Sequence, residues 1–199
     1  MSYIYRNKTK TKETDLINRS QILFYISTMK CYKRVRDPAL VSFLYITAAR
    51  ISEVVKQIRK YDIDINEIEG QKFMVINNVK CLKRKKGNEA KRNIAINITK
   101  EFEFINVFFE WLNKLDDDDI IFNISRKHAY KIIRRFYDPA FPHYLRHIRL
   151  THLTSLYGFN SADLRQFTGW SSDIPASHYV HLNWKDVAKK MLWGNKWKI

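Results

Sequence analysis

Apolar residues in the first part of the chain recur at the spacing of amphipathic helices. One such run covers residues 15–29. A second extends from residue 38 to about 47, where Asp37-Pro38 is predicted to provide an N-cap and a first-turn proline. A third begins at Ile51 and is expected to reach about Lys60. The pattern therefore predicts three helices before the chain changes character.

Between residues 61 and 98 the apolar period changes from that of a helix to that of a strand. Apolar and polar residues alternate, and Glu69-Gly70 and Lys86-Gly87-Asn88 are typical turns. The alternating apolar positions are Ile63, Ile65, Phe73, Val75, Ile94, Ile96 and Ile98. This region is predicted to form a small three-stranded antiparallel sheet.

Helical spacing returns after residue 100 and continues to the end of the chain. The predicted helices cover residues 101–115, 125–137, 143–156, 160 or 161 to 167, 175–181 and 184–193. Four consecutive acids, Asp116 to Asp119, end the first of these helices. They could bind a metal ion, but such a run is more typical of a solvated loop. The whole pattern predicts an α+β fold, mostly α, with one three-stranded antiparallel sheet.

The composition adds a strong positive charge to this picture. The chain of 199 residues carries 36 Lys and Arg against 20 Asp and Glu, a formal net charge of +16. This excess favours a polyanionic partner, nucleic acid first and an anionic membrane surface second. With 45% hydrophobic residues the chain should fold, apart from a flexible basic lead-in at residues 1–13.

Nothing in the sequence indicates membrane insertion or export. No stretch approaches the ~20 apolar residues of a membrane span, and the N-terminus lacks the apolar region of a signal peptide. Cys31 and Cys81, the two cysteines, stand outside any metal-ligand spacing and are expected to be unpaired thiols. We therefore expect a cytoplasmic protein.

Two arginines, a histidine and a tyrosine occur in an order that would let them bind and react with one phosphodiester. Guanidinium forks bind two phosphate oxygens at once, and a phenolic oxygen can attack phosphorus. Arg50 follows two small residues, Ala48 and Ala49, and Glu53 can hold its guanidinium in one orientation. Taken singly, an arginine between two helices is more often solvated or salt-bridged.

The other members of this set lie in the C-terminal third. His143 and Arg146 are one helical turn apart, so both should project from one face near a helix N-terminus, which favours a phosphate. Tyr179 lies nine residues past Trp170 (179 − 170 = 9), whose indole N–H can donate to a phosphate oxygen. Without this context His143 and Arg146 would be read as part of an ordinary basic helical face, and Tyr179 as a packing residue.

These segments resemble the signature boxes of the tyrosine recombinases, the family of Xer-type, Cre and phage lambda-type integrases. Residues 47–53, Thr-Ala-Ala-Arg-Ile-Ser-Glu, resemble the box Thr-Gly-x-Arg-x-Ser-Glu. Residues 143–147 resemble His-x-x-Arg-His, and residues 168–172 resemble Gly-His/Trp-Ser-Ser, nine residues before the family's nucleophile. Ala48 departs from the usual glycine, and we take it to mean that the turn avoids a positive φ.

The resemblance implies a reaction that needs neither metal nor cofactor. Tyr179 would attack the scissile phosphorus and form a 3′-phosphotyrosine, while Arg50, Arg146 and Trp170 stabilise the non-bridging oxygens. His143 would assist proton transfer at the tyrosine. Rejoining would need no ATP, because the covalent bond retains the phosphodiester energy.

The general acid in this scheme would be a lysine of the hairpin between the last two strands, which protonates the leaving 5′ oxygen. The hairpin offers Lys83, Lys85 and Lys86. The family's usual offset falls on Gly87, so the turn is expected to be one or two residues longer, which gives Lys86 or Lys85. Lys86 is slightly favoured, but the parity of the strand could favour Lys85.

The resemblance covers nearly the whole chain and implies one catalytic domain over residues 14–199. Too few residues precede the Arg50 helix for the N-terminal core-binding domain that most members carry. The implied partner is double-stranded DNA, on which members synapse as homotetramers, and the implied location is the nucleoid. We therefore expect a site-specific recombinase or integrase.

Two other functions are compatible with the sequence. A type IB topoisomerase shares the chemistry but relaxes DNA as a monomer, and a DNA-binding remnant would lack catalysis. The spacing of the boxes and the predicted C-terminal helix, which members use to dock onto a neighbouring protomer, favour recombination. The intact set of Arg50, His143, Arg146, Trp170 and Tyr179 argues against a remnant.

Overall fold

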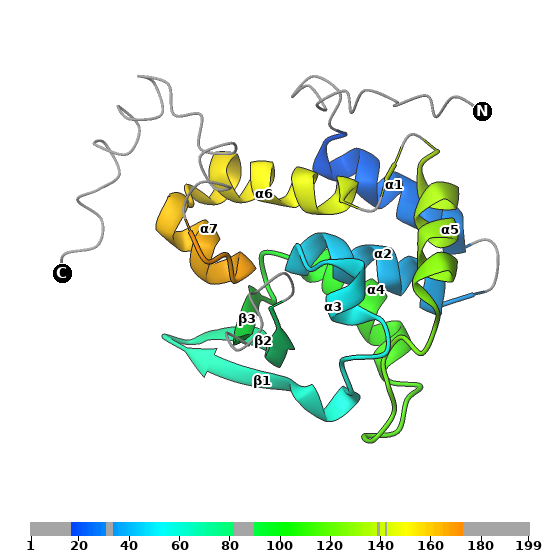
Figure 1. The fold of residues 1–199 in the computed structure, drawn as a ribbon, viewed down its shortest axis with the longest axis horizontal. Coiled ribbons are helices and arrows are strands. Elements are labelled where there is room, and N and C mark those ends of the chain that lie inside the picture. The colour runs from blue at the N-terminus through cyan, green and yellow to red at the C-terminus, as the bar shows by residue number, and fades with distance from the viewer. Residues whose placement is uncertain (1–16, 31–33, 82–89, 139, 142, 173–199) are drawn as a thin grey trace, which may run out of the picture.

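The computed structural model describes residues 17–30, 34–81, 90–138, 140–141 and 143–172. Its elements are α1 (Arg19–Lys30), α2 (Arg36–Thr47), α3 (Ile51–Val54), the 3-10 helix η2 (Lys60–Asp62), β1 (Ile63–Ile68), β2 (Gln71–Lys80), β3 (Lys91–Asn97), α4 (Phe102–Leu112), α5 (Arg126–Phe136), α6 (Tyr144–Tyr157) and α7 (Ser161–Thr168). The α+β class, mostly α, is confirmed (Figure 1). The predicted lead-in, the turn at residues 86–88 and the predicted helices at 175–181 and 184–193 lie outside the described residues.

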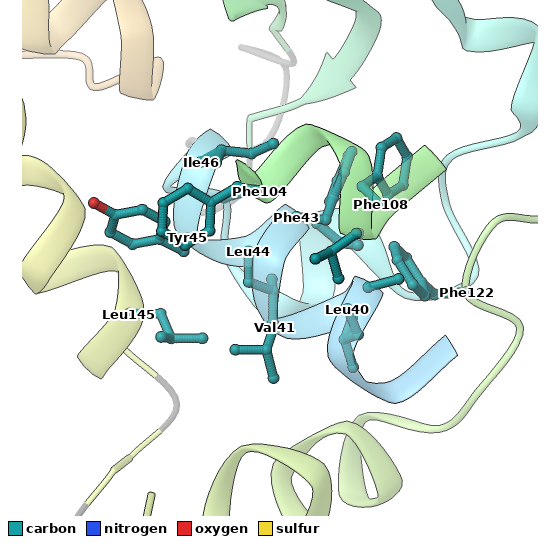
Figure 2. Close-up of a cluster of buried hydrophobic side chains, with 14 of the residues drawn as sticks. Leu40, Val41, Phe43, Leu44, Tyr45, Ile46, Phe104, Phe108, Phe122 and Leu145 are labelled. Carbon is teal, nitrogen blue, oxygen red and sulfur yellow. The ribbon is translucent and has the colours of Figure 1, made fainter. Parts of the chain in front are cut away.

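Helix α2 forms the centre of the core because it is apolar all round. Every residue from Asp37 to Thr47 is buried. Helices α4 and α6 pack against it, with α1 and α5 beside it. Figure 2 shows Phe43 of α2 next to Phe108 of α4, with their ring centroids 4.7 Å apart. The end of α2, from which the chain continues to Arg50, is therefore held in a rigid part of the molecule.

The start of α2 differs from the prediction. Its N-cap is Val35, and Asp37 lies inside the first turn instead of capping it. The buried Asp37 carboxylate accepts hydrogen bonds from Arg36 (2.9 Å) and from Arg135 of α5 (3.0 Å). Two guanidiniums and the positive end of the helix stabilise this carboxylate, so it joins α2 to α5.

Three antiparallel strands in the order β1-β2-β3 confirm the predicted sheet. On β2 the buried face begins at Met74 and not at Phe73, from which the predicted alternation started. Residues 73–76 are all apolar and fit either face, so the register decides: Met74 pairs with Ile96, and paired residues share a face.

The helix predicted from Ile51 to about Lys60 stops after one turn. Helix α3 ends at Val54, and Lys56 has a φ of 58°. The Lys56 amide donates to the carbonyl oxygen of Phe122 (3.1 Å). This long-range hydrogen bond replaces the next helical one, so the chain turns early toward the sheet.

The later helices confirm the predictions within a few residues at each end. Ser125 caps α5 by accepting a hydrogen bond from the His128 amide (3.1 Å). Residues 116–119 form an exposed loop in which the Asp119 carboxylate accepts from the Asp116 amide (2.9 Å). Among the described residues, no three His, Cys, Asp or Glu side chains are grouped to hold a metal ion. None of the described helices is both long and apolar enough to cross a membrane.

Candidate active site

Arg50 stands at the start of α3, where Glu53 holds both its backbone and its guanidinium. The Arg50 amide donates to Glu53 Oε2 (3.0 Å), and Arg50 Nη1 donates to Oε1 (2.6 Å). The Glu53 side chain is fully buried, whereas 15% of the Arg50 side chain is exposed. One carboxylate thus sets the orientation of the guanidinium while leaving part of it accessible, as the sequence predicted for this pair.

Arg146 reaches the same part of the molecule from α6. Its Nη1 donates to the carbonyl oxygen of Ala48, 98 residues earlier in the chain. The Arg146 guanidinium also lies over the ring of Trp170, 5.3 Å from its centroid. Trp170 packs against the same cluster as Ala48. The residues around Arg50, Arg146 and Trp170 therefore meet where α2, α3, α6 and the end of α7 come together.

 
Ala48 has a φ of 48° and a ψ of 24°, a left-handed conformation, so the prediction that this turn avoids a positive φ was wrong. The residue ends α2, a position where glycine is usual because it lacks a Cβ. The alanine methyl is fully buried against Leu150, Leu153 and Leu164. Burial of this methyl offsets part of the strain, and tertiary packing overrides the local preference.

His143 precedes α6 as its N-cap, with a φ of −102° and a ψ of 1°. His143 therefore stands at the start of the helix that carries Arg146, three residues before it. The His143 carbonyl oxygen accepts from the amide of His147 (2.9 Å). Burial, and then the charge of Arg146, lower the pKa of His147, so this imidazole is neutral at pH 7 and adds no charge beside Arg146.

The sequence model of the phage integrase family matches residues 17–186, most of the chain. The chain belongs to the phage integrase family. A comparison with curated protein sequences finds no significant match. The family therefore follows from the family model, and the solved structures add evidence on the fold.

The chain is similar in structure to several recombinases and integrases. The XerH site-specific recombinase bound to its difH substrate is 19% identical with a TM-score of 0.63, and the match covers 98% of this chain and 58% of that one. The Tn1549 transposon integrase bound to circular intermediate DNA is 17% identical with a TM-score of 0.60, covering 93% and 67%. The catalytic domain of bacteriophage HP1 integrase is 14% identical with a TM-score of 0.54, covering 91% and 95%. At these identities the likeness shows a shared fold, and the chain spans less than two thirds of the XerH chain.

In this member of the phage integrase family, one buried residue beside Arg50 and Glu53 was not predicted from the sequence: Arg92 on β3. Its Nη2 donates to Glu53 Oε2 (3.0 Å), and its Nε donates to the carbonyl oxygen of Phe167 at the end of α7 (3.0 Å). A signal was present in the sequence, since Arg92 continues the inward-facing alternation of Ile94 and Ile96 by one step. A charged residue at an inward position of a strand needs a buried partner.

The Glu53 carboxylate is ionised although it is buried. Burial alone would raise the pKa of its carboxyl, but the charge of Arg92, followed by the hydrogen bonds and charge of Arg50, lowers this pKa below its usual value. Glu53 is thus an anion at neutral pH, between two guanidiniums.

A cavity of about 460 Å³ lies beside this cluster, between the end of α7 and the strands β2 and β3. Its lining is mainly polar and includes three cationic side chains and the Trp170 ring. These cations are Lys91, Arg92 and Arg165. Such a lining suits a phosphate group.

Tyr179 lies outside the described residues, and so do the three candidate general acids, Lys83, Lys85 and Lys86. The base of their hairpin is described, since the Cys81 amide donates to the carbonyl oxygen of Ala90 (2.8 Å). The roles assigned to these four side chains stay predictions from the sequence.

Proposed function

We propose that this chain is a site-specific DNA recombinase or integrase that cuts and rejoins strands through a 3′-phosphotyrosine at Tyr179. The observation that carries the proposal is that Arg146 contacts both the Ala48 carbonyl oxygen, two residues before Arg50, and the Trp170 ring, across segments far apart in the sequence. Two guanidiniums and an indole N–H match the charge and the acceptors of one phosphodiester.

The proposed roles follow from the chemistry of each side chain. Tyr179 attacks phosphorus and releases a 5′-hydroxyl, and Arg50 and Arg146 stabilise the charge that builds on the non-bridging oxygens. Trp170 donates its indole N–H to one of these oxygens. His143 assists proton transfer at the attacking tyrosine.

The leaving 5′ oxygen takes its proton from a lysine of the hairpin between β2 and β3. Lys86 is our first choice, with Lys85 and Lys83 as alternatives. Because the phosphotyrosine bond retains the energy of the broken phosphodiester, attack by a 5′-hydroxyl restores a DNA strand without ATP.

Double-stranded DNA is the proposed partner, and a homotetramer on DNA is the proposed assembly. The net charge of +16 suits a polyanion, and the similar XerH structure contains its difH substrate. Such a protein would act at the nucleoid, through a catalytic domain over residues 14–199.

The test is covalent capture on DNA. The chain is incubated with a pool of duplexes that carry a random central sequence and a nick, so that the short cleaved fragment diffuses away and cannot be rejoined. We expect a DNA adduct that survives denaturation, and mass spectrometry should place it on Tyr179. The reaction should proceed in a metal chelator.

Two variants serve as controls for this capture. Tyr179→Phe should bind the selected duplex and form no adduct, because it lacks the attacking oxygen. Tyr61→Phe alters an exposed tyrosine of η2, 57% accessible, and should form the adduct normally. An adduct on another residue, or none from a wild-type chain that binds DNA, would contradict the proposal.

A further inference from the structure

Arg92 links three segments that carry proposed catalytic groups. Through Glu53 it reaches the α3 segment that carries Arg50, and through the Phe167 carbonyl oxygen it reaches the end of α7. Its Nη1 also lies 3.6 Å from Cys81 Sγ, at the base of the lysine hairpin. Only 3% of its side chain is exposed, so none of these contacts is shared with bulk solvent.

The approach of Arg92 to the end of α7 is close. Gly169 follows this helix with a φ of 68°, and a Cβ placed there would lie 2.9 Å from Arg92 Cδ. The same Cβ would overlap Cys81 Sγ. The arginine stem thus packs directly against the backbone of the residue before Trp170, and any shift of Arg92 would be passed to that backbone.

The charges of the cluster give Arg92 a second effect. Glu53 accepts hydrogen bonds from both Arg50 (2.6 Å) and Arg92 (3.0 Å), so the three side chains together carry a charge of +1 (2 − 1 = 1). Without Arg92 the Glu53 carboxylate would cancel the charge of Arg50. In a buried site such a change acts strongly, because solvent screens it little.

We propose that Arg92 is a positioning residue for strand cleavage. It neutralises Glu53, which leaves the positive charge of Arg50 for the bound phosphate, and it holds the end of α7 so that Trp170 stays beside Arg146. This inference rests on the proposed function, since it assigns Arg92 a part in the same reaction.

The test measures two quantities for each variant. One is the single-turnover rate at which saturating protein cleaves the nicked duplex selected in the capture experiment, and the other is the affinity for that duplex. Arg92→Met should slow cleavage by about 10²-fold while affinity changes little, because Arg92 is buried and its effect reaches the phosphate through Arg50 and Trp170. Arg92→Lys should slow cleavage less, since it keeps the positive charge. It should still cleave more slowly than the wild type, because lysine lacks the guanidinium fork that also reaches the Phe167 carbonyl oxygen.

A rescue variant separates the charge effect from packing. Arg92→Met combined with Glu53→Gln removes both charges of the pair and again leaves the Arg50 charge uncancelled. This double variant should cleave faster than Arg92→Met alone. A packing role predicts the opposite, because the second substitution would only add to the damage.

Thermal unfolding of each variant shows which are folded in the assay. If Arg92→Met is unfolded, Arg92→Lys decides: slower cleavage at unchanged affinity supports the proposal, and wild-type cleavage overturns it. Arg135→Met is the matched control, because it also takes one guanidinium from a buried carboxylate, Asp37, at the joint of α2 and α5. It should cleave at the wild-type rate once DNA is bound.

The outcomes distinguish this inference from the proposed function. Absence of any adduct from the wild-type chain would overturn both. A normal wild-type adduct with folded Arg92 variants that cleave at the wild-type rate would overturn the positioning role alone. Two further outcomes would overturn the positioning role: a double variant that cleaves no faster than Arg92→Met, or an Arg135→Met control that is slowed as much as Arg92→Met.

Discussion

Ala48 combines a backbone conformation that alanine disfavours with a side chain that the core needs. Its carbonyl oxygen accepts the hydrogen bond from Arg146, so the shape of this turn helps to set where that guanidinium lies. The left-handed conformation costs an alanine about 1–2 kcal/mol, and burial of one methyl returns about 0.8 kcal/mol. Burial of the methyl thus offsets part of the cost, which is why alanine is tolerated here.

This balance can be tested with glycine. Ala48→Gly relieves the strain but loses the methyl and adds freedom to the unfolded chain, so the free energy of unfolding should change by less than about 1 kcal/mol. Ala49→Gly is the matched control: Ala49 is also buried, but it has no positive φ. It should lose about 1–2 kcal/mol. Guanidinium chloride unfolding measures both, and equal losses would show that Ala48 is not strained.

At the scale of elements, one buried carboxylate joins three helices. Glu101, directly before α4, accepts from Arg19 of α1 (2.6 Å) and from Arg149 of α6 (2.6 Å). The hydroxyl of Tyr157, also on α6, donates to it. Arg149 lies one helical turn after Arg146, so Glu101 fixes the helix that places Arg146 in the site.

Replacing this carboxylate should destabilise the fold strongly. Glu101→Gln leaves the buried Arg149 guanidinium without its counter-charge and takes one of two carboxylates from Arg19, at a cost of about 3–5 kcal/mol in the free energy of unfolding. Glu103→Gln is the control, because Glu103 also pairs with Arg19 (3.2 Å) but is 59% exposed. It should cost less than about 1 kcal/mol. Urea unfolding at pH 7 compares them, and similar losses would contradict a role for Glu101 in holding the helices together.

At the scale of the whole molecule, the buried ionisable groups make stability depend on pH. Burial, then the charges of Arg149 and Arg19, lower the pKa of His152 to about 4, although Glu101 acts in the opposite direction. The His152 ring is hydrogen-bonded to the Tyr45 hydroxyl (2.8 Å). An unfolded histidine gains its proton near pH 6.5, so acid favours the unfolded chain from that pH downward.

We therefore expect stability to fall in two stages as the pH is lowered. The first, between about 6.5 and 4, comes mainly from His152, with a contribution from His147, whose pKa burial also lowers. The second comes from Glu53 and Glu101, whose lowered pKa values make their contribution present above the ordinary carboxyl pKa and lost as pH falls below it. His152→Gln should remove much of the first stage and leave the second. Denaturant unfolding at pH 7, 6, 5 and 4 tests this, and parallel curves for variant and wild type would refute it.

Much of the fold and part of the site could be predicted because the signals are local. Ser125 before a basic amphipathic run marked the start of α5, and Glu53 three residues after Arg50 marked their contact. The failures have a common origin. The length of α3 depended on Phe122, and the buried face of β2 depended on its pairing with Ile96.

The sequence by itself determined the order of helices and strands, the strong positive charge and the spacing of the three boxes, because each depends on neighbours along the chain. Only the tertiary structure decided the left-handed turn at Ala48 and the place of Arg92 in the site. The partners that set them lie 98 residues from Ala48 and 39 and 75 residues from Arg92. Burial forced each polar group there to find a partner, and no local pattern states which distant group that is.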